Sequence, residues 1–166
     1  IEESKKVFLD CEDYNTRANL MWCATTALNG TIGLGVPQDW ATHSIGHQLT
    51  MDFGLDHAQS LAVILPSLLK HQFFVKKERL ATYGKNVWCL TDDTEENIAM
   101  AAINKTEAFF RSIGARTRLE EYGIQREQIE NLPAKIMAIT QAKKLGEHKR
   151  IGEKEIAEIL ELAFDK

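Results

Sequence analysis

Residues 40–57 read WATHSIGHQLTMDFGLDH and hold three of the five histidines in the 166-residue chain. A helix is predicted over residues 38–51, and it carries His43 and His47 four residues apart. Side chains at that spacing lie one turn apart on one face of an α-helix. Neutral imidazole is the commonest nitrogen ligand for zinc and ferrous iron, and it moves protons near neutral pH. The segment therefore predicts a helix that presents metal-binding or acid–base chemistry.

The residues that follow return the chain towards this helix. Gly54-Leu55-Asp56 breaks the helical pattern, and a second helix is predicted over residues 57–70. The glycine allows a sharp turn, so His57 is expected close to the first two histidines. Pro66 is expected to kink or interrupt the second helix, because proline lacks the amide donor and clashes with the preceding turn.

The rest of the chain also has helical periodicity. Residues 20–28 are apolar nearly all round, which predicts a helix buried in the centre of the domain and ended by Asn29-Gly30. Residues 91–96 carry capping oxygens and first-turn carboxylates for another helix. Further helices are predicted from residues 131–133 and over residues 156–163. Because no segment alternates as a strand would, the predicted fold is an all-α bundle of about six to nine helices.

Composition narrows the class of protein. Apolar residues make up 44% of the chain and charged residues 27%, with a net charge of −4. Mixed charges without a basic face argue against nucleic acid as a partner. The longest apolar run, residues 61–69, is far shorter than the roughly 18 residues of a membrane span. We expect one domain over residues 1–166 and no membrane partner.

The three cysteines are an odd number without CxxC spacing. Cys11, Cys23 and Cys89 therefore suit buried thiols in a reducing cytoplasm better than a disulfide framework. This composition predicts a cytoplasmic protein.

The histidines leave several interpretations open. A pair at helical spacing is often only a hydrogen-bonded or solvated feature, in which case the chain is a helical interaction or stand-alone metal-binding domain without catalysis. Alternatively, His43, His47 and His57 together could hold a metal with water at an open position, as in a helical metal-dependent hydrolase. No Glu follows His43, so the HExxH motif of zinc proteases is absent.

Four short motifs occur in a fixed order, and together they are far more specific than two histidines at helical spacing. They are Trp40-Ala41-Thr42-His43, Gly46-His47-Gln48-Leu49, Gly54-Leu55-Asp56-His57-Ala58 and Leu65-Pro66. This pattern resembles the metal-binding segment of iron-containing alcohol dehydrogenases, particularly the butanol dehydrogenase-like group. Weaker similarity extends over nearly the whole chain. Gln48 stands where that group commonly has Glu, which puts any charge-based role there in doubt.

The resemblance implies a role for each histidine. It makes His43 and His57 direct ligands of the catalytic metal, which would be Fe²⁺ or Zn²⁺. It makes His47 a neighbour that lines the substrate and nicotinamide pocket and could relay a proton to solvent. The implied activity is interconversion of alcohols and aldehydes by metal-assisted hydride transfer.

The resemblance also implies that residues 1–166 are only the C-terminal helical domain of such an enzyme. NAD or NADP would be held mainly by an N-terminal dinucleotide-binding domain absent from this chain. The other two metal ligands, spaced Asp-x-x-x-His, would also lie upstream. We therefore expect the isolated chain to be inactive and to bind divalent metal weakly. The family often forms dimers, which leaves a homodimer open.

Four other residues have a predicted role or environment. Asp56 could orient the ring of His57 or cap the helix that begins there. Trp40 fits a core position better than a pocket wall. His71 and His148 lie among charged residues and are expected to be solvated.

Overall fold

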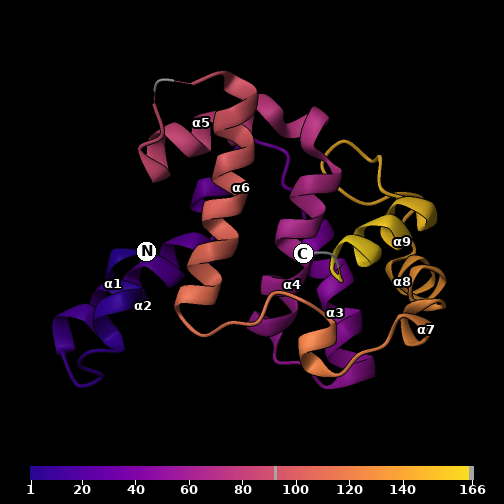
Figure 1. The fold of residues 1–166 in the computed structure, drawn as a ribbon, viewed down its shortest axis with the longest axis horizontal. Coiled ribbons are helices and arrows are strands. Elements are labelled where there is room, and N and C mark those ends of the chain that lie inside the picture. The colour runs from indigo at the N-terminus through magenta and orange to yellow at the C-terminus, as the bar shows by residue number, and fades with distance from the viewer. Residues whose placement is uncertain (92, 165–166) are drawn as a thin grey trace. The chain divides into compact units, whose positions relative to one another are not determined.

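A computed structural model describes residues 1–91 and 93–164, and it confirms the all-α prediction (Figure 1). In this part of the chain the only strand-like pairing is an isolated bridge between Leu145 and Ile151. The helices are α1 (Glu2–Val7), α2 (Tyr14–Leu28), η1 (Thr31–Gly33), α3 (Ala41–Phe53), α4 (His57–His71), α5 (Phe73–Trp88), α6 (Glu95–Ser112), η2 (Glu120–Tyr122), α7 (Arg126–Ile129), α8 (Leu132–Thr140) and α9 (Glu153–Leu162). None of the described helices is long and apolar enough to cross a membrane.

The chain divides into two compact units, Ile1–Gln38 and Asp39–Lys166. The first contains α1, α2 and the short η1, and the second contains all the other helices. All three histidines of the predicted site belong to the second unit. The single domain over residues 1–166 stays a prediction.

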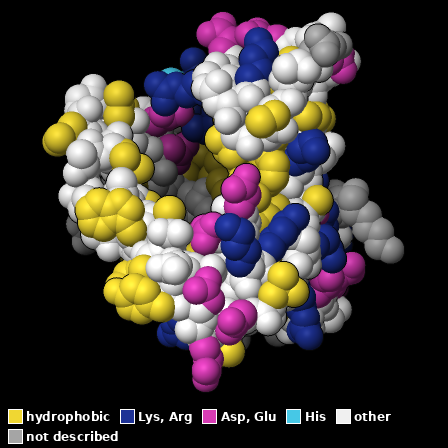
Figure 2. All heavy atoms as spheres, turned by 90° about the vertical axis from the view of Figure 1, so that its left-hand side faces the viewer, with side chains coloured by type: hydrophobic (Ala, Val, Ile, Leu, Met, Phe, Trp, Pro, Cys, Tyr) yellow, Lys and Arg dark blue, Asp and Glu magenta, His cyan; other side chains and the backbone are white. Residues whose placement is uncertain are grey.

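The first unit corrects the expectation of a buried central helix. α2 begins where the Asp13 carboxylate accepts the backbone N–H groups of Asn15 and Thr16. Thr16 is the one buried residue of α2, and Met21 and Trp22 are both more than 70% exposed. Figure 2 shows large hydrophobic side chains of this kind standing at the surface. Two helices and a single 3₁₀ turn are too small a unit to bury a helix that is apolar all round.

The cysteines also differ from expectation. Cys11, Cys23 and Cys89 are all exposed, so the prediction of buried thiols is wrong. Cys89 ends α5 with a left-handed backbone (φ 53°), a position at a helix end where the side chain points outward.

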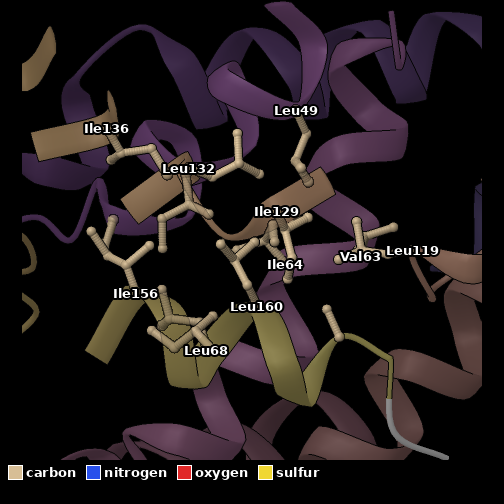
Figure 3. Close-up of a cluster of buried hydrophobic side chains, with 14 of the residues drawn as sticks. Leu49, Val63, Ile64, Leu68, Leu119, Ile129, Leu132, Ile136, Ile156 and Leu160 are labelled. Atoms are coloured by element: carbon tan, nitrogen blue, oxygen red, sulfur yellow. The ribbon is translucent and has the colours of Figure 1, made fainter. Parts of the chain in front are cut away.

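The larger hydrophobic core of the second unit lies between α3, α4, α7, α8 and α9 (Figure 3). Leu49 of α3, Ile64 of α4, Ile136 of α8 and Leu160 of α9 are each at most 1% exposed. Burial of such side chains stabilises the fold by roughly 1.5–3 kcal/mol each. The core faces of α3 and α4 are therefore fixed, and their other faces are free to carry the histidines.

Pro66 does not interrupt α4, so of the two expectations for this proline, a kink or an interruption, the interruption is wrong. The helix runs from His57 to His71 with Pro66 inside it. Pro66 is buried, and its neighbours Ser67 and Leu68 are at most 2% exposed. Packing of this face outweighs the loss of one backbone hydrogen bond.

α5 and α6 form a separate pair with a small core of their own, which includes Phe73, Leu80, Ile98 and Ile103. Gly84 is the point of closest approach. A Cβ atom at residue 84 would lie 2.9 Å from Ile98 Cγ2 and 3.1 Å from the Ile98 carbonyl oxygen. Because glycine has no side chain, α5 and α6 can lie this close together at residue 84.

A carboxylate on α6 connects this pair to the rest of the second unit. Glu107 accepts hydrogen bonds from Lys70 Nζ of α4 at 3.1 Å and from Thr117 Oγ1 at 3.2 Å, and it forms an ion pair with Arg118. Burial alone would raise the pKa of the Glu107 carboxyl, but its contacts with Lys70 and Arg118 outweigh burial and hold the pKa below its ordinary value of 4.5. The carboxylate thus neutralises two cations that come from different segments.

Gly84→Ala should destabilise the protein by about 1–3 kcal/mol, the usual cost of overpacking a tight contact. The measurement is urea unfolding followed by circular dichroism. Lys85→Ala, an exposed change on the same helix, is the control and should stay within about 0.5 kcal/mol of the parent. Equal stability of the two variants would contradict the close contact of α5 with α6.

Glu107→Gln should lower stability at neutral pH by roughly 3 kcal/mol, because it leaves two cations without their carboxylate. The lowered pKa of Glu107 means that its contribution is present above pH 4.5 and is lost as the pH falls through the folded-state value. The difference between parent and variant should therefore shrink in acid. Urea unfolding at a series of pH values checks this, and a difference that is constant down to the acid transition would contradict it.

Candidate functional site

α3 presents two of the predicted site residues. The Oδ1 atom of Asp39 accepts the backbone N–H of Ala41 at 2.8 Å, and this bond fixes the start of the helix. Gly54 ends it with a left-handed backbone (φ 70°), as the sequence predicted. His43 is half-buried and His47 is exposed.

α4 begins at the third histidine. Asp56 occupies the N-cap position, where its backbone N–H donates to Gln59 Oε1 at 3.0 Å. Asp56 thus stands at the N-cap position, and the choice between the two roles considered for its carboxylate stays a prediction. His57 is the first residue of α4 and is exposed.

The two helices touch at Gly46, between the histidines of α3. A Cβ atom at residue 46 would lie 3.0 Å from Ser60 Oγ and 3.2 Å from Leu61 Cδ2. Ser60 is fully buried, and its hydroxyl donates to the backbone carbonyl of His57 at 2.8 Å. This contact holds the first turn of α4 against α3. Sequence reasoning missed both residues, although a glycine inside a helical pattern often marks such a close approach.

The structure brings all three histidines together. The ring centroids of His43 and His57 are 5.3 Å apart, those of His47 and His57 5.2 Å, and those of His43 and His47 6.1 Å. Residues from two helices therefore converge on one place. The sequence-based prediction that His57 folds back towards α3 is confirmed.

The charge state of His43 suits a metal ligand. Burial lowers the pKa of the His43 imidazole, and the nearby rings of His57 and His47 lower it further. A lower pKa favours the neutral ring at physiological pH, which leaves a nitrogen lone pair free to bind a cation.

The spacing of His57 from His43, and equally from His47, fits two ligands of one metal ion. Zinc–nitrogen bonds of about 2.0–2.1 Å in a tetrahedral site place two ring centroids about 5 Å apart. Within residues 1–91 and 93–164, however, no group of three or more His, Cys, Asp or Glu side chains has the geometry of a metal site. The described residues can thus supply part of a ligand set.

Trp40 and Gln48, which flank the histidines of α3 in the sequence, have different surroundings. Trp40 is 52% exposed, and its ring stands edge-on to His43 at 5.0 Å between centroids. Its expected core position is therefore wrong, and it forms a wall beside the histidines. Gln48 is buried, and its Nε2 atom donates to Asp52 Oδ1 at 2.8 Å. The other oxygen of Asp52 accepts from Lys135 Nζ of α8 at 2.8 Å.

The remaining histidines lie away from this cluster. His71 Nε2 pairs with Glu158 Oε2 at 2.8 Å, and its side chain is only 15% exposed. The expectation that His71 is solvated is therefore wrong. The side chain of His148 is 49% exposed.

Comparison with known proteins identifies a family for nearly the whole chain. Residues 1–164 match the model of the Fe-containing alcohol dehydrogenase family, C-terminal. The chain is 46% identical over 136 residues to the NADPH-dependent aldehyde reductase YqhD of Escherichia coli K12, covering 82% of this chain and 35% of the relative. It is 32% identical over 166 residues to the probable NADH-dependent butanol dehydrogenase 1 of Bacillus subtilis, covering 99% of this chain and 42% of the relative.

Solved structures give the same result. The substrate- and cofactor-free aldehyde reductase YqhD from E. coli superposes with a TM-score of 0.93 at 41% identity, over 98% of this chain and 42% of that one. The NADH-dependent butanol dehydrogenase A of Thermotoga maritima gives a TM-score of 0.92 at 26% identity, over 99% and 43%. The chain spans less than half the length of these relatives.

Gly46→Ala should separate α3 from α4 by a few tenths of an ångström and destabilise the protein by about 1–3 kcal/mol. Ser60→Ala removes the hydroxyl that the new methyl group would meet, so the double variant should regain part of this loss. A double-mutant cycle from urea unfolding measures the coupling. Additive effects of the two changes would show that the helices do not touch here.

Proposed function

This chain belongs to the Fe-containing alcohol dehydrogenase family, as its C-terminal part, and on that basis we propose that it contributes two imidazole ligands to the catalytic metal of an NAD(P)-dependent alcohol dehydrogenase. The observation that carries the proposal is the convergence of His43 and His57, from two different helices, at 5.3 Å between ring centroids. The substrates would be small alcohols and aldehydes, as the names of the relatives indicate for those proteins.

His43 and His57 would hold the metal through a ring nitrogen each. Imidazole suits both Fe²⁺ and Zn²⁺, and the family description favours iron. When bound, such a metal supplies Lewis-acid polarisation of the carbonyl oxygen of an aldehyde. The remaining ligands and the nicotinamide site would come from the part of the enzyme that these 166 residues do not include, and the partial coverage of the relatives supports this division.

His47 and Trp40 would act on the substrate side of the site. His47 is exposed and lies 5.2 Å from His57 between ring centroids, so its imidazole can accept or release a proton near the substrate oxygen and exchange it with solvent. The same ring would line the nicotinamide pocket. Trp40, edge-on to His43, would exclude water from one side of that ligand.

Two other interpretations predict different results. A helical hydrolase would use His47 as a third ligand, although the described residues include no set of three ligands with metal geometry. A stand-alone interaction domain would need none of the three histidines for activity. Substitution of each histidine separates these cases.

We expect His43→Ala and His57→Ala to abolish metal retention and aldehyde reduction in the enzyme that includes the dinucleotide-binding domain. His47→Ala should retain the metal but lower kcat by about 10²–10⁴-fold, the usual contribution of a proton-transfer group, and flatten the pH profile. The measurements are metal content by atomic emission and NAD(P)H oxidation with short aldehydes. Lys85→Ala, an exposed change on α5 away from the histidines, is the control and should change neither the metal content nor the activity.

The outcomes distinguish the interpretations. Loss of metal in His47→Ala would favour the hydrolase, and full activity of His43→Ala and His57→Ala would favour the interaction domain. The chain of 166 residues alone should show no dehydrogenase activity and weak metal binding. Robust NAD(P)H-dependent aldehyde reduction by this chain would contradict the proposed division of the site.

A further inference from the structure

Three charged side chains meet where α3 begins. Lys76 Nζ, from α5, lies 2.8 Å from Asp39 Oδ2 and 2.6 Å from Glu147 Oε1. Glu147 belongs to the turn closed by the bridge between Leu145 and Ile151. The side chains of Lys76, Asp39 and Glu147 are 11%, 17% and 6% exposed. Because isolated buried charges are costly, removing any one of these three side chains would leave its partners shielded from solvent and unpaired.

Lys76 holds both carboxylates at once. Glu147 has a second cation, since Arg79 NH1 lies 3.3 Å from its Oε2 atom, but the Arg79 side chain is 69% exposed. Among the described residues, Lys76 is the only cation paired with Asp39. Burial lowers the pKa of the Lys76 ammonium, but the hydrogen bonds to Asp39 and Glu147 outweigh it and raise the pKa, so Lys76 stays charged.

Asp39 connects this cluster to the histidine site. Its Oδ2 atom binds Lys76, while its Oδ1 atom accepts the N–H of Ala41, one of the first helical amides that have no partner within the helix. Trp40 follows directly, and its carbonyl accepts the N–H of Ser44 at 2.9 Å. His43 lies within this same turn. Any shift of Asp39 is therefore passed to Trp40 and His43 through one turn of backbone.

We propose that Lys76 is a positioning residue of the histidine site. Lys76 holds the first turn of α3, and with it His43, at a fixed distance from His57. The functional part of this inference rests on the proposed role of His43 and His57 as metal ligands. Because the two ligands come from separate helices, Gly46 fixes the middle of α3 against α4, and Lys76 fixes its start. Metal affinity depends on groups that orient the ligands as well as on the ligands themselves.

Hydrogen exchange tests the geometric part without any metal. Lys76→Met should speed exchange of the amides of Ala41 and Ser44 by about ten-fold, because the first turn of α3 opens more often. Exchange within α9 should stay unchanged after correction for global stability. Arg79→Met is the matched control, since it removes a cation from Glu147 and leaves the ion pair of Asp39 intact. It should not change the exchange rates of the Ala41 and Ser44 amides.

Two further variants keep the test decisive. Lys76→Arg keeps the charge and should restore most of the protection. If Lys76→Met does not fold, Asp39→Asn replaces it, because it keeps an acceptor for the Ala41 N–H but weakens the ion pair, and it should produce a smaller change in the same direction. Unchanged exchange in the variant that folds, or an equal change in Arg79→Met, would overturn the proposal.

Metal affinity tests the functional part. In the enzyme that includes the dinucleotide-binding domain, Lys76→Met should weaken Zn²⁺ binding by about ten-fold, the lower end for residues behind metal ligands, and Arg79→Met should not. Faster exchange with unchanged Zn²⁺ affinity would overturn the link to the site. If His43→Ala also leaves Zn²⁺ affinity unchanged, the ligand assignment fails instead, so the two failures are distinguishable.

Discussion

The contact between Gly46 and Ser60 is the constraint on which the candidate site depends. α3 and α4 are joined by a short turn, and their apolar faces, with Ile45 and Ile64, are buried in the main core. The core fixes one face of each helix, and the distance between the two helices on the side of the histidines depends on residues 46 and 60. A Cβ atom at residue 46 would lie only 3.0 Å from Ser60 Oγ, so glycine at this position permits the close approach. The opposite faces of both helices are then set, and the imidazoles of His43 and His57 converge as a result.

Charges fix the ends of helices whose middles are fixed by packing. Glu107 of α6 holds Lys70 near the end of α4, and Lys76 of α5 holds Asp39 at the start of α3. Both clusters join segments that are far apart in the sequence. Such pairs add little net stability when the cost of desolvation is counted, but removing one partner is expensive. In this fold each pair joins a helix that carries histidines to a helix that does not.

Much of the fold could be predicted because its signals are local. The helix after Thr94 was predicted from its capping residues, and the structure shows the Thr94 hydroxyl accepting the N–H of Asn97. The clustering of the histidines could be predicted from helical spacing and from the glycine break at Gly54. The burial of α2 could not, because an apolar sequence shows that a surface can be buried but does not show what covers it. Sequence reasoning could not decide between a kink and an interruption at Pro66 for a similar reason, since the packing that preserves α4 involves residues distant in sequence.

Long-range polar contacts were also beyond sequence reasoning. Lys76 and Glu147 are 71 residues apart, and no periodicity connects them. The start of α3 was predicted about three residues too early, because nothing in the sequence shows that the Asp39 carboxylate turns to accept the amide of Ala41. The candidate ligands could thus be named from motifs, whereas the residues that hold them in place required the structure.

The pair formed by Gln48 and Asp52 has a consequence for how the family varies. Gln48 is buried and donates its amide to Asp52, whose other oxygen binds Lys135. Glu at position 48, which the resemblance gives as common in the butanol dehydrogenase-like group, would place a second carboxylate one helical turn from Asp52. Gln48, Asp52 and Lys135 together carry no net charge, and Glu at position 48 would make the same three positions negative. The amide at position 48 thus sets the charge of this stretch of α3.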